Sequence, residues 1–217
     1  MKAFVSWSGG KDCMLALHRF MRNPANEVLS LVNMCDEDSH LSRSHGLSRE
    51  MVARQVACMN LPITQQRTGR SNYEEQFKKA IDQLKTKGIT AGVFGDIYLM
   101  EHRTWIERVC RDMGIEAIFP LWKFPTKDLL REFIDVGFKA LTVSVHTEKL
   151  PQNWLGREIN HNFFKDITAL EGIDACAEEG EYHSFVYDGP LFSLPVPFVR
   201  KAISEHDNHY FLEIAEK

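Results

Sequence analysis

The sequence lacks paired cysteines and has no excess of positive charge. Because no two cysteines form a C-x-x-C pair, the sequence argues against a zinc ribbon, and the odd number of cysteines argues against a secreted disulfide framework. The formal net charge is −4, so the field of the whole chain does not favour nucleic acid. A local basic patch stays open at Arg43, Arg49, Arg54, Arg67 and Arg70. The isolated cysteines are Cys13, Cys35, Cys58, Cys110 and Cys176.

Long apolar runs are also missing, so no segment is expected to cross a membrane. No secretory hydrophobic region follows Met1, because a strand-like segment begins at once at residues 2–6. We therefore expect a cytoplasmic protein with reduced thiols. The composition, 44% hydrophobic and 26% charged, is typical of a globular chain. The 217 residues suffice for one large domain or for a domain with a smaller companion.

The first half of the sequence alternates short apolar runs with amphipathic segments. Such strand–helix repeats with apolar strands are typical of a parallel sheet covered by helices on both faces. We predict an α/β fold with a doubly wound, five-stranded parallel sheet, whose ligand site lies beyond the carboxyl ends of the strands. The expected strands are residues 2–6, 27–34, 63–67, 91–95 and 116–119, and the expected helices are 12–21, 47–59, 73–87 and 99–113.

The pattern changes after Pro125. Helices are expected at 127–136 and 159–170, with strand-like segments at 140–145, 182–187, 191–198 and 209–214. We therefore predict a nucleotide-binding domain over residues 1–124 and a smaller C-terminal α+β domain over residues 125–217, which would carry the substrate or acceptor site.

A glycine-rich turn joins the first expected strand to the first helix. Gly9 and Gly10 lack the Cβ atom, so successive N–H groups can curl around an anion at the helix N-terminus. Ser8 adds a hydroxyl donor. Lys11 adds a full positive charge, and we expect it to project from the loop tip with little contribution to the core. Asp12, in the first helical turn, can cap the helix or hold Mg²⁺.

This turn matches neither of two common phosphate-binding motifs. A Walker A loop would need glycine in place of Val5 and serine or threonine in place of Asp12, and a G-x-G-x-x-G motif does not occur. The turn is therefore either a tight turn with a solvated lysine or a phosphate loop of another kind, and the full S-G-G-K-D after a first strand favours the phosphate loop.

Two further positions fall at the expected ligand edge. Gly95 and Asp96 end the fourth strand, where glycine would admit a nucleotide and the carboxylate would contact ribose, adenine or Mg²⁺. The alternative for Asp96 is to cap the helix that follows. His45 lies between a polar loop and a helix, where it would contact phosphate or solvent.

The loop S-G-G-K-D at residues 8–12 resembles the PP-loop of the N-type ATP pyrophosphatases, which have a HUP-like fold. More narrowly, blocks along nearly the whole chain resemble the diphthine–ammonia ligase family, in a bacterial-type branch. The blocks are S-H-G at 44–46, F-G-D-I at 94–97, F-P-L-W at 119–122, L-G-R-E at 155–158 and E-E-G-E-Y-H-S-F-V-Y-D-G-P at 178–190. The last is the longest and the most specific to the family.

The resemblance implies an ATP-dependent carbon–nitrogen ligase. A carboxylate would attack the α-phosphate of ATP, expel pyrophosphate and form an acyl-adenylate, from which ammonia would displace AMP to leave an amide. ATP, Mg²⁺, ammonium and a carboxylate acceptor, which could be carried on a protein, are the implied cofactors and partners. The nucleotide would be bound by Ser8, Gly9, Gly10, Lys11, Asp12, Cys13, His45, Gly95 and Asp96, with Lys11 and Asp12 also catalytic.

The acidic block at 178–190 would complete the site. Carboxylates and an imidazole together suit the binding or deprotonation of ammonium, so Glu178, Glu181 and His183 are further catalytic candidates. We expect them, with Gly180, to face the PP-loop across a cleft. The plain alternative is a charged surface loop.

The sequence departs from the family pattern near both groups of candidates. Cys13 replaces a commoner serine, and its thiol is a weaker donor. Ala175 and Ala177 stand where proline and glycine are usual, which could alter the path of the loop before the acidic block.

Two other functions compete with a ligase. A tRNA-modifying PP-loop enzyme would bring a basic surface or paired cysteines, which the net charge and the isolated cysteines oppose. A nucleotide-binding regulator without catalysis would not need the acidic block. Release of AMP and pyrophosphate would separate both enzymes from the regulator.

Overall fold

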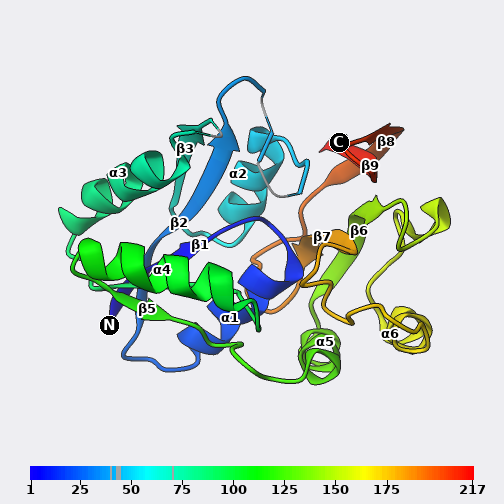
Figure 1. Cartoon of the computed structure of the whole chain (residues 1–217), viewed down its shortest axis with the longest axis horizontal. Coiled ribbons are helices and arrows are strands. Elements are labelled where there is room, and N and C mark those ends of the chain that lie inside the picture. The colour runs from blue at the N-terminus through cyan, green and yellow to red at the C-terminus, as the bar shows by residue number, and fades with distance from the viewer. Residues whose placement is uncertain (40, 43–44, 70) are drawn as a thin grey trace.

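The computed structural model describes residues 1–39, 41–42, 45–69 and 71–217. Arg43 and Arg70 of the candidate basic patch, and Ser44 of the S-H-G block, lie outside the described residues. Figure 1 shows two sheets side by side, with the N-terminal elements on the left and the C-terminal elements on the right. Within the described part, no helix has the length and apolar character needed to span a bilayer.

The N-terminal sheet has five parallel strands in the order β3-β2-β1-β4-β5. The chain runs outward from β1 in one direction and then returns to its other side with β4. The carboxyl ends of β1 and β4 therefore flank the point where strand order reverses, the expected position of a ligand. The strands are β1 (Lys2–Ser6), β2 (Glu27–Asp36), β3 (Ile63–Thr68), β4 (Ala91–Val93) and β5 (Glu116–Ile118).

Helices cover both faces of this sheet, as predicted. Along β1 the side chains alternate: Ala3 and Val5 belong to one buried cluster with α1 and α2, whereas Phe4 belongs to another with α3 and α4. The doubly wound α/β fold is therefore confirmed. The helices are α1 (Lys11–Met21), α2 (Arg49–Cys58), α3 (Tyr73–Lys85) and α4 (Met100–Asp112).

The C-terminal half forms an antiparallel sheet with two flanking helices, in the strand order β7-β6-β9-β8. Its buried side chains continue the cluster under α1 and α2, so one core runs through both halves. The elements are α5 (Thr126–Asp135), β6 (Lys139–His146), a 3₁₀ turn at Gln152–Trp154, α6 (His161–Thr168), β7 (Tyr182–Asp188), β8 (Phe198–His206) and β9 (His209–Glu216).

One strand prediction was wrong. Residues 191–197 form no strand, and β8 begins only at Phe198 and runs to His206. Pro195 and Pro197 lack the N–H needed in a ladder. The true strand escaped recognition because it is an edge strand, exposed along most of its length, so its residues do not alternate between apolar and polar.

Candidate active site

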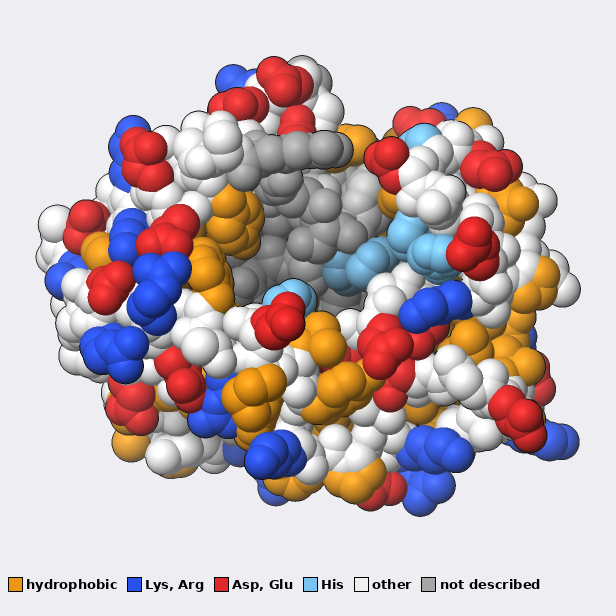
Figure 2. All heavy atoms as spheres, in the orientation of Figure 1, with side chains coloured by type: hydrophobic (Ala, Val, Ile, Leu, Met, Phe, Trp, Pro, Cys, Tyr) orange, Lys and Arg blue, Asp and Glu red, His pale blue; other side chains and the backbone are white. Residues whose placement is uncertain are grey.

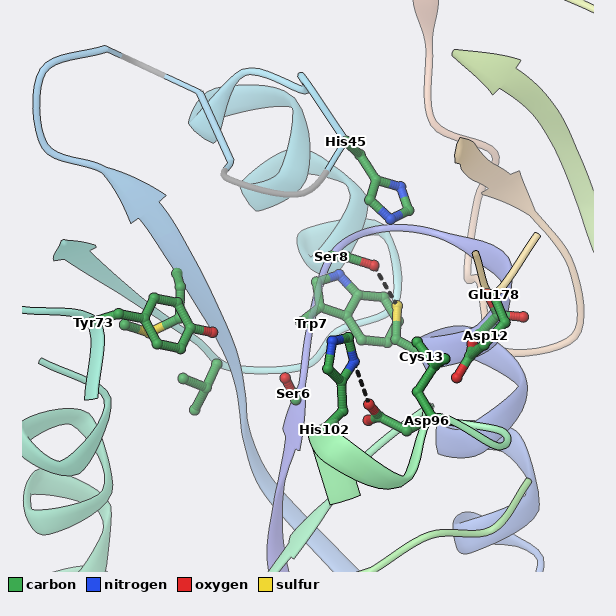
Figure 3. Close-up of a pocket in the computed structure, with 14 residues that line it drawn as sticks. Ser6, Trp7, Ser8, Asp12, Cys13, His45, Tyr73, Asp96, His102 and Glu178 are labelled. Carbon is green, nitrogen blue, oxygen red and sulfur yellow. Dashed lines mark hydrogen bonds and ion pairs between the residues drawn. The ribbon is translucent and has the colours of Figure 1, made fainter. Parts of the chain in front are cut away.

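A cavity of about 250 Å³ lies at the carboxyl ends of β1, β2 and β4. Figure 3 shows Asp12 and Glu178 together at one end of it and Tyr73 at the other, with Ser8 and Trp7 between them. Residues from both halves of the chain therefore line one cavity at the predicted edge of the sheet. Its lining includes Ser6, Trp7, Ser8, Asp12, Cys13, Val32, Met34, His45, Tyr73, Gly95, Asp96, Leu99, His102 and Glu178.

The turn between β1 and α1 forms one side of this cavity. Gly9 has φ +88°, a backbone conformation that favours glycine. The first helical hydrogen bond of α1 is the one that Met14 N donates to Gly10 O at 3.2 Å. The amides of Asp12 and Cys13 therefore lie before the first residue that donates a helical hydrogen bond. The Cys13 thiol donates to Gly10 O at 3.1 Å and lies 3.4 Å from Ser8 Oγ. The helix start thus offers N–H groups to an anion in the cavity.

Two glycines here are required by neighbouring protein atoms. A Cβ at Gly10 would lie 2.2 Å from Cε1 of His45. A Cβ at Gly95 would lie 2.9 Å from both the carbonyl carbon of Asp12 and the nitrogen of Cys13. Gly95 lines the cavity, but its missing side chain lets the end of β4 pack against the start of α1.

Gln55, which the sequence analysis missed, holds the turn from behind. Its fully buried side chain accepts a hydrogen bond from Trp7 Nε1 at 2.9 Å and donates to Gly9 O at 2.8 Å and Val186 O at 2.6 Å. A glutamine in an amphipathic helix gives no sequence signal of such a role. The buried Trp7 also lines the cavity.

Lys11 does not project from the loop tip, contrary to expectation. Its side chain is only 4% exposed, and its ammonium donates to Asp12 Oδ2 at 2.9 Å and to the carbonyl of Cys176. It also lies 4.9 Å from the centroid of the Tyr182 ring. Burial alone would lower the pKa of Lys11, but the Asp12 carboxylate raises it above its ordinary value, so the ammonium stays charged. It contacts the turn before the acidic block rather than the cavity.

Strand β7, within the acidic block, packs directly on the phosphate loop. Val186 N donates to Gly9 O at 3.1 Å, and Ser184 Oγ accepts from Lys11 N at 3.1 Å. His45 Nδ1 lies 2.9 Å from Ser184 O and so donates to that carbonyl. Burial lowers the pKa of His45 to about 4, so the imidazole is neutral at pH 7. The loop is therefore shaped by both halves of the chain.

Three carboxylates from three segments line the cavity, those of Asp12, Asp96 and Glu178. Glu178 Oε1 accepts from Ile97 N at 2.8 Å. Burial raises the pKa of Glu178 to about 7, and the nearby Asp12 and Asp96 carboxylates add to this effect. Glu178 can therefore exchange a proton near neutral pH.

His102, at the start of α4, has an exposed side chain that also lines the cavity. Its Nδ1 lies 3.4 Å from Asp96 Oδ1, an interaction that raises the pKa of His102. Its position in the first turn after β4 was the signal available in the sequence. Beyond it lies an adjoining cavity of about 410 Å³, walled partly by Tyr73, Phe77 and Trp105.

Glu181 and His183 do not face this cavity. Glu181 is 1% exposed, and its Oε1 accepts from Asp174 N at 3.3 Å and lies 3.5 Å from Lys149 Nζ. Its other oxygen, Oε2, is buried with no hydrogen-bond partner among the described residues. His183 lies behind His45, with 4.6 Å between ring centroids, and lines a different cavity. Of the acidic block's three catalytic candidates, only Glu178 lines the cavity at the carboxyl ends of the strands.

Two family models cover almost the whole chain. The diphthamide synthase N-terminal domain matches residues 1–117, and the diphthamide synthase C-terminal domain matches residues 125–216. The chain belongs to the diphthamide synthase family. The expected family is thereby confirmed.

Curated relatives carry the name diphthine–ammonia ligase. The protein from Schizosaccharomyces pombe is 26% identical over 96% of this chain and 38% of its own length, and the human protein is 26% identical over 65% of this chain and 53% of its own. The rat protein is 23% identical over 88% of this chain and 80% of its own. The chain thus spans about two fifths to about half of the first relatives that it matches.

A solved structure shows a weak likeness. The crystal structure of a predicted subunit of tRNA methyltransferase from Methanocaldococcus jannaschii aligns with a TM-score of 0.47 and 13% identity, over 88% of this chain and 98% of that one. A likeness of this strength supports no functional argument.

Proposed function

We propose that this chain is an ATP-dependent amide-forming ligase. The observation that carries the proposal is the shared cavity, where the phosphate loop and Asp96 of the first half meet Glu178 of the second. The names of the relatives, in which ammonia is a substrate, point to the same chemistry.

The cavity suggests how ATP would lie. The pyrophosphate end would meet the amides of Asp12 and Cys13 and the hydroxyl of Ser8, and the base would point toward the aromatic end at Tyr73. These fixed donors would stabilise the charge that grows on the leaving pyrophosphate. In the first step an acceptor carboxylate oxygen bonds to the α-phosphorus while the bond to the bridging oxygen breaks, and pyrophosphate departs.

The second step needs a base near the new acyl-adenylate. Glu178, with a pKa of about 7, would take a proton from ammonium. The ammonia lone pair would then attack the acyl carbon, the bond between that carbon and the AMP oxygen would break, and AMP would leave while the new nitrogen releases its surplus proton to solvent. Ammonium is a weak acid, so a carboxylate with a raised pKa is a better partner for it than an ordinary one.

Mg²⁺ fits this cavity as a companion of the phosphates. The described residues hold no group of three or more His, Cys, Asp or Glu able to bind a metal alone. Mg²⁺ in nucleotide sites usually takes one or two carboxylates, completed by phosphate oxygens and water. Asp12 and Asp96 would supply the carboxylates, and the bound ion would neutralise charge on the phosphates.

The test measures AMP and pyrophosphate from ATP with ammonium and a panel of carboxylic acids. We expect Asp96→Asn to reduce their formation at least tenfold, with Asp38→Asn, an exposed change outside the cavity, as the matched control. ATP binding without any AMP release across the panel would instead favour the non-catalytic regulator.

A further inference from the structure

The turn that carries Glu178, residues 174–181, is held in a strained shape. Its backbone folds back twice, since Ala177 N donates to Asp174 O and Gly180 N donates to Ala177 O, both at 3.0 Å. Ala177 has φ +59°, a left-handed conformation that a residue other than glycine keeps only where its surroundings hold it. Figure 2 shows acidic side chains, with a basic one beside them, at the rim of the hollow on this face. The turn therefore needs contacts that fix it.

Asp174 fixes the backbone at Glu178. Its Oδ1 accepts from Cys176 N at 2.9 Å and from Glu178 N at 3.2 Å. From there the Glu178 side chain reaches the first half of the chain, where its Oε1 accepts from Ile97 N at 2.8 Å. The place of the Glu178 carboxylate in the wall of the shared cavity therefore depends on where Asp174 lies.

Glu181 holds Asp174 from the other end of the turn. Its side chain is buried, and its Oε1 accepts from Asp174 N at 3.3 Å. The carbonyl of Glu181 accepts from His146 N, at the end of β6, at 2.9 Å. Lys149, just after β6, lies 3.5 Å from the same Oε1 and donates to Glu179 O at 3.2 Å. Glu181 thus ties the start of the turn to the end of β6.

The burial of Glu181 is poorly compensated. Its Oε2 has no hydrogen-bond partner in the part of the chain that the structure describes, and Lys149, beside Oε1, is 31% exposed. A buried carboxylate with an unpaired oxygen costs stability. It is therefore a poor means of stabilising the fold, and what it supplies is a fixed acceptor for the amide of Asp174.

We propose that Glu181 is a positioning residue, which through Asp174 keeps the Glu178 carboxylate at the wall of the shared cavity for the amination step. The proposal rests on the ligase function proposed above. It accounts for a residue that belongs to the same turn as Glu178 but does not face the cavity. Without Glu181 the turn would relax and ATP would still be cleaved, but water instead of ammonia would take the acyl group from the adenylate, giving back the carboxylic acid and AMP.

The first measurement follows hydrogen exchange at the Ile97 amide by NMR in the full chain, because this amide bonds to Glu178 directly. Glu181→Met removes the acceptor and should speed this exchange about tenfold or more. Glu181→Gln keeps an acceptor oxygen and replaces one that has no partner among the described residues, so its exchange should stay within about twofold of wild type. Glu179→Gln, an exposed change in the same turn, is the matched control.

The second measurement compares the amide with the AMP that is formed from ATP, ammonium and an accepted carboxylic acid. In Glu181→Met the amide formed per AMP should fall about tenfold, while ATP affinity and AMP formation stay within about threefold of wild type. A merely structural role would lower both products together. Glu181→Gln should restore the ratio of amide to AMP.

Asp174→Ala removes the next link to Glu178 and should reproduce both effects. Wild-type exchange at Ile97 in either variant, an unchanged ratio of amide to AMP, or equal losses in Glu181→Met and Glu181→Gln would overturn the positioning role. Loss of the folded state in both Glu181→Met and Asp174→Ala would overturn it as well. If the wild-type chain forms no AMP with any acid, the ligase proposal fails, whereas the exchange at Ile97 still decides whether Glu181 positions Glu178.

Discussion

Replacement of Lys11 by methionine tests whether this lysine binds phosphate or supports the turn that carries Glu178. Methionine has a similar length and no charge, so the change removes the ammonium without opening a large cavity. If the ammonium held phosphate, the loss would appear in ATP affinity. The structure instead shows it bonded to Asp12 and to the Cys176 carbonyl, under the turn that carries Glu178. We therefore expect stability and the pH profile to change more than nucleotide binding does.

The size of the effect follows from those contacts. Removing one partner of a buried ion pair costs about 3–5 kcal/mol. The Asp12 side chain is 29% exposed, so its carboxylate can recover some hydration from the cavity, and the lower end, about 3 kcal/mol, is expected. The ammonium also lowers the pKa of Glu178, so its loss should raise that pKa and move the rise of amide formation to higher pH.

Three measurements test this reasoning. Urea unfolding gives the free energy of unfolding, and titration gives the dissociation constant for ATP. The rate of amide formation, measured between pH 6 and pH 9, gives the pH profile. Lys201→Met, on the exposed strand β8, is the control for loss of a lysine. A Lys11→Met protein with unchanged stability and profile but ATP affinity a hundredfold weaker would refute the reasoning and restore Lys11 as the phosphate clamp.

Further predictions concern the cavity wall. Glu178→Gln should stop amide formation. In the wild type the free energy of unfolding should fall as pH rises from about 4.5 to about 7, because over this range Glu178 binds more protons in the folded state than in the unfolded state. The variant should lack this fall. Urea unfolding should show the variant more stable by up to about 3 kcal/mol above pH 7 and equal to wild type below pH 4.5. Gln55→Leu should lower the free energy of unfolding by about 2–4 kcal/mol, measured in urea, because several buried hydrogen bonds are lost; a loss under 1 kcal/mol would contradict this. Gly10→Ala should abolish nucleotide binding by displacing His45, and the double variant with His45→Ala should recover part of it in the same titration.

The strands of the first sheet could be predicted from the sequence because the hydrophobic periodicity clearly distinguishes strands from helices in that half of the chain. Its apolar runs and the glycines at residues 9 and 10 correctly predicted a turn between the first strand and the first helix. The direction in which each side chain points was harder to predict from the sequence. Lys11 and Asp12 are adjacent, yet Asp12 lines the cavity and Lys11 points under the loop. The direction of Lys11 depends on Cys176 and Tyr182, which are far away in sequence.

The same limitation affected the acidic block. Alternation along β7 sends Ser184 toward the loop and His183 to the other side, a distinction that required the strand's register. Gln55 could not be found at all, because its partners are backbone carbonyls of Gly9 and Val186. The motifs indicated which segments border the cavity, whereas long-range packing decided which of their side chains line it.

The hydrogen bond from Val186 to Gly9 has a consequence for synthesis on the ribosome. The loop that would grip ATP is made among the first residues, but the strand that fixes its shape ends at Asp188. A chain that is still being synthesised contains the first sheet and the glycines, but it lacks the support of β7 and, at an earlier stage, the turn that carries Glu178. If the chain is the proposed ligase, it should therefore be unable to activate a carboxylate until synthesis has passed Asp188, so that no acyl-adenylate forms before the Glu178 turn is present.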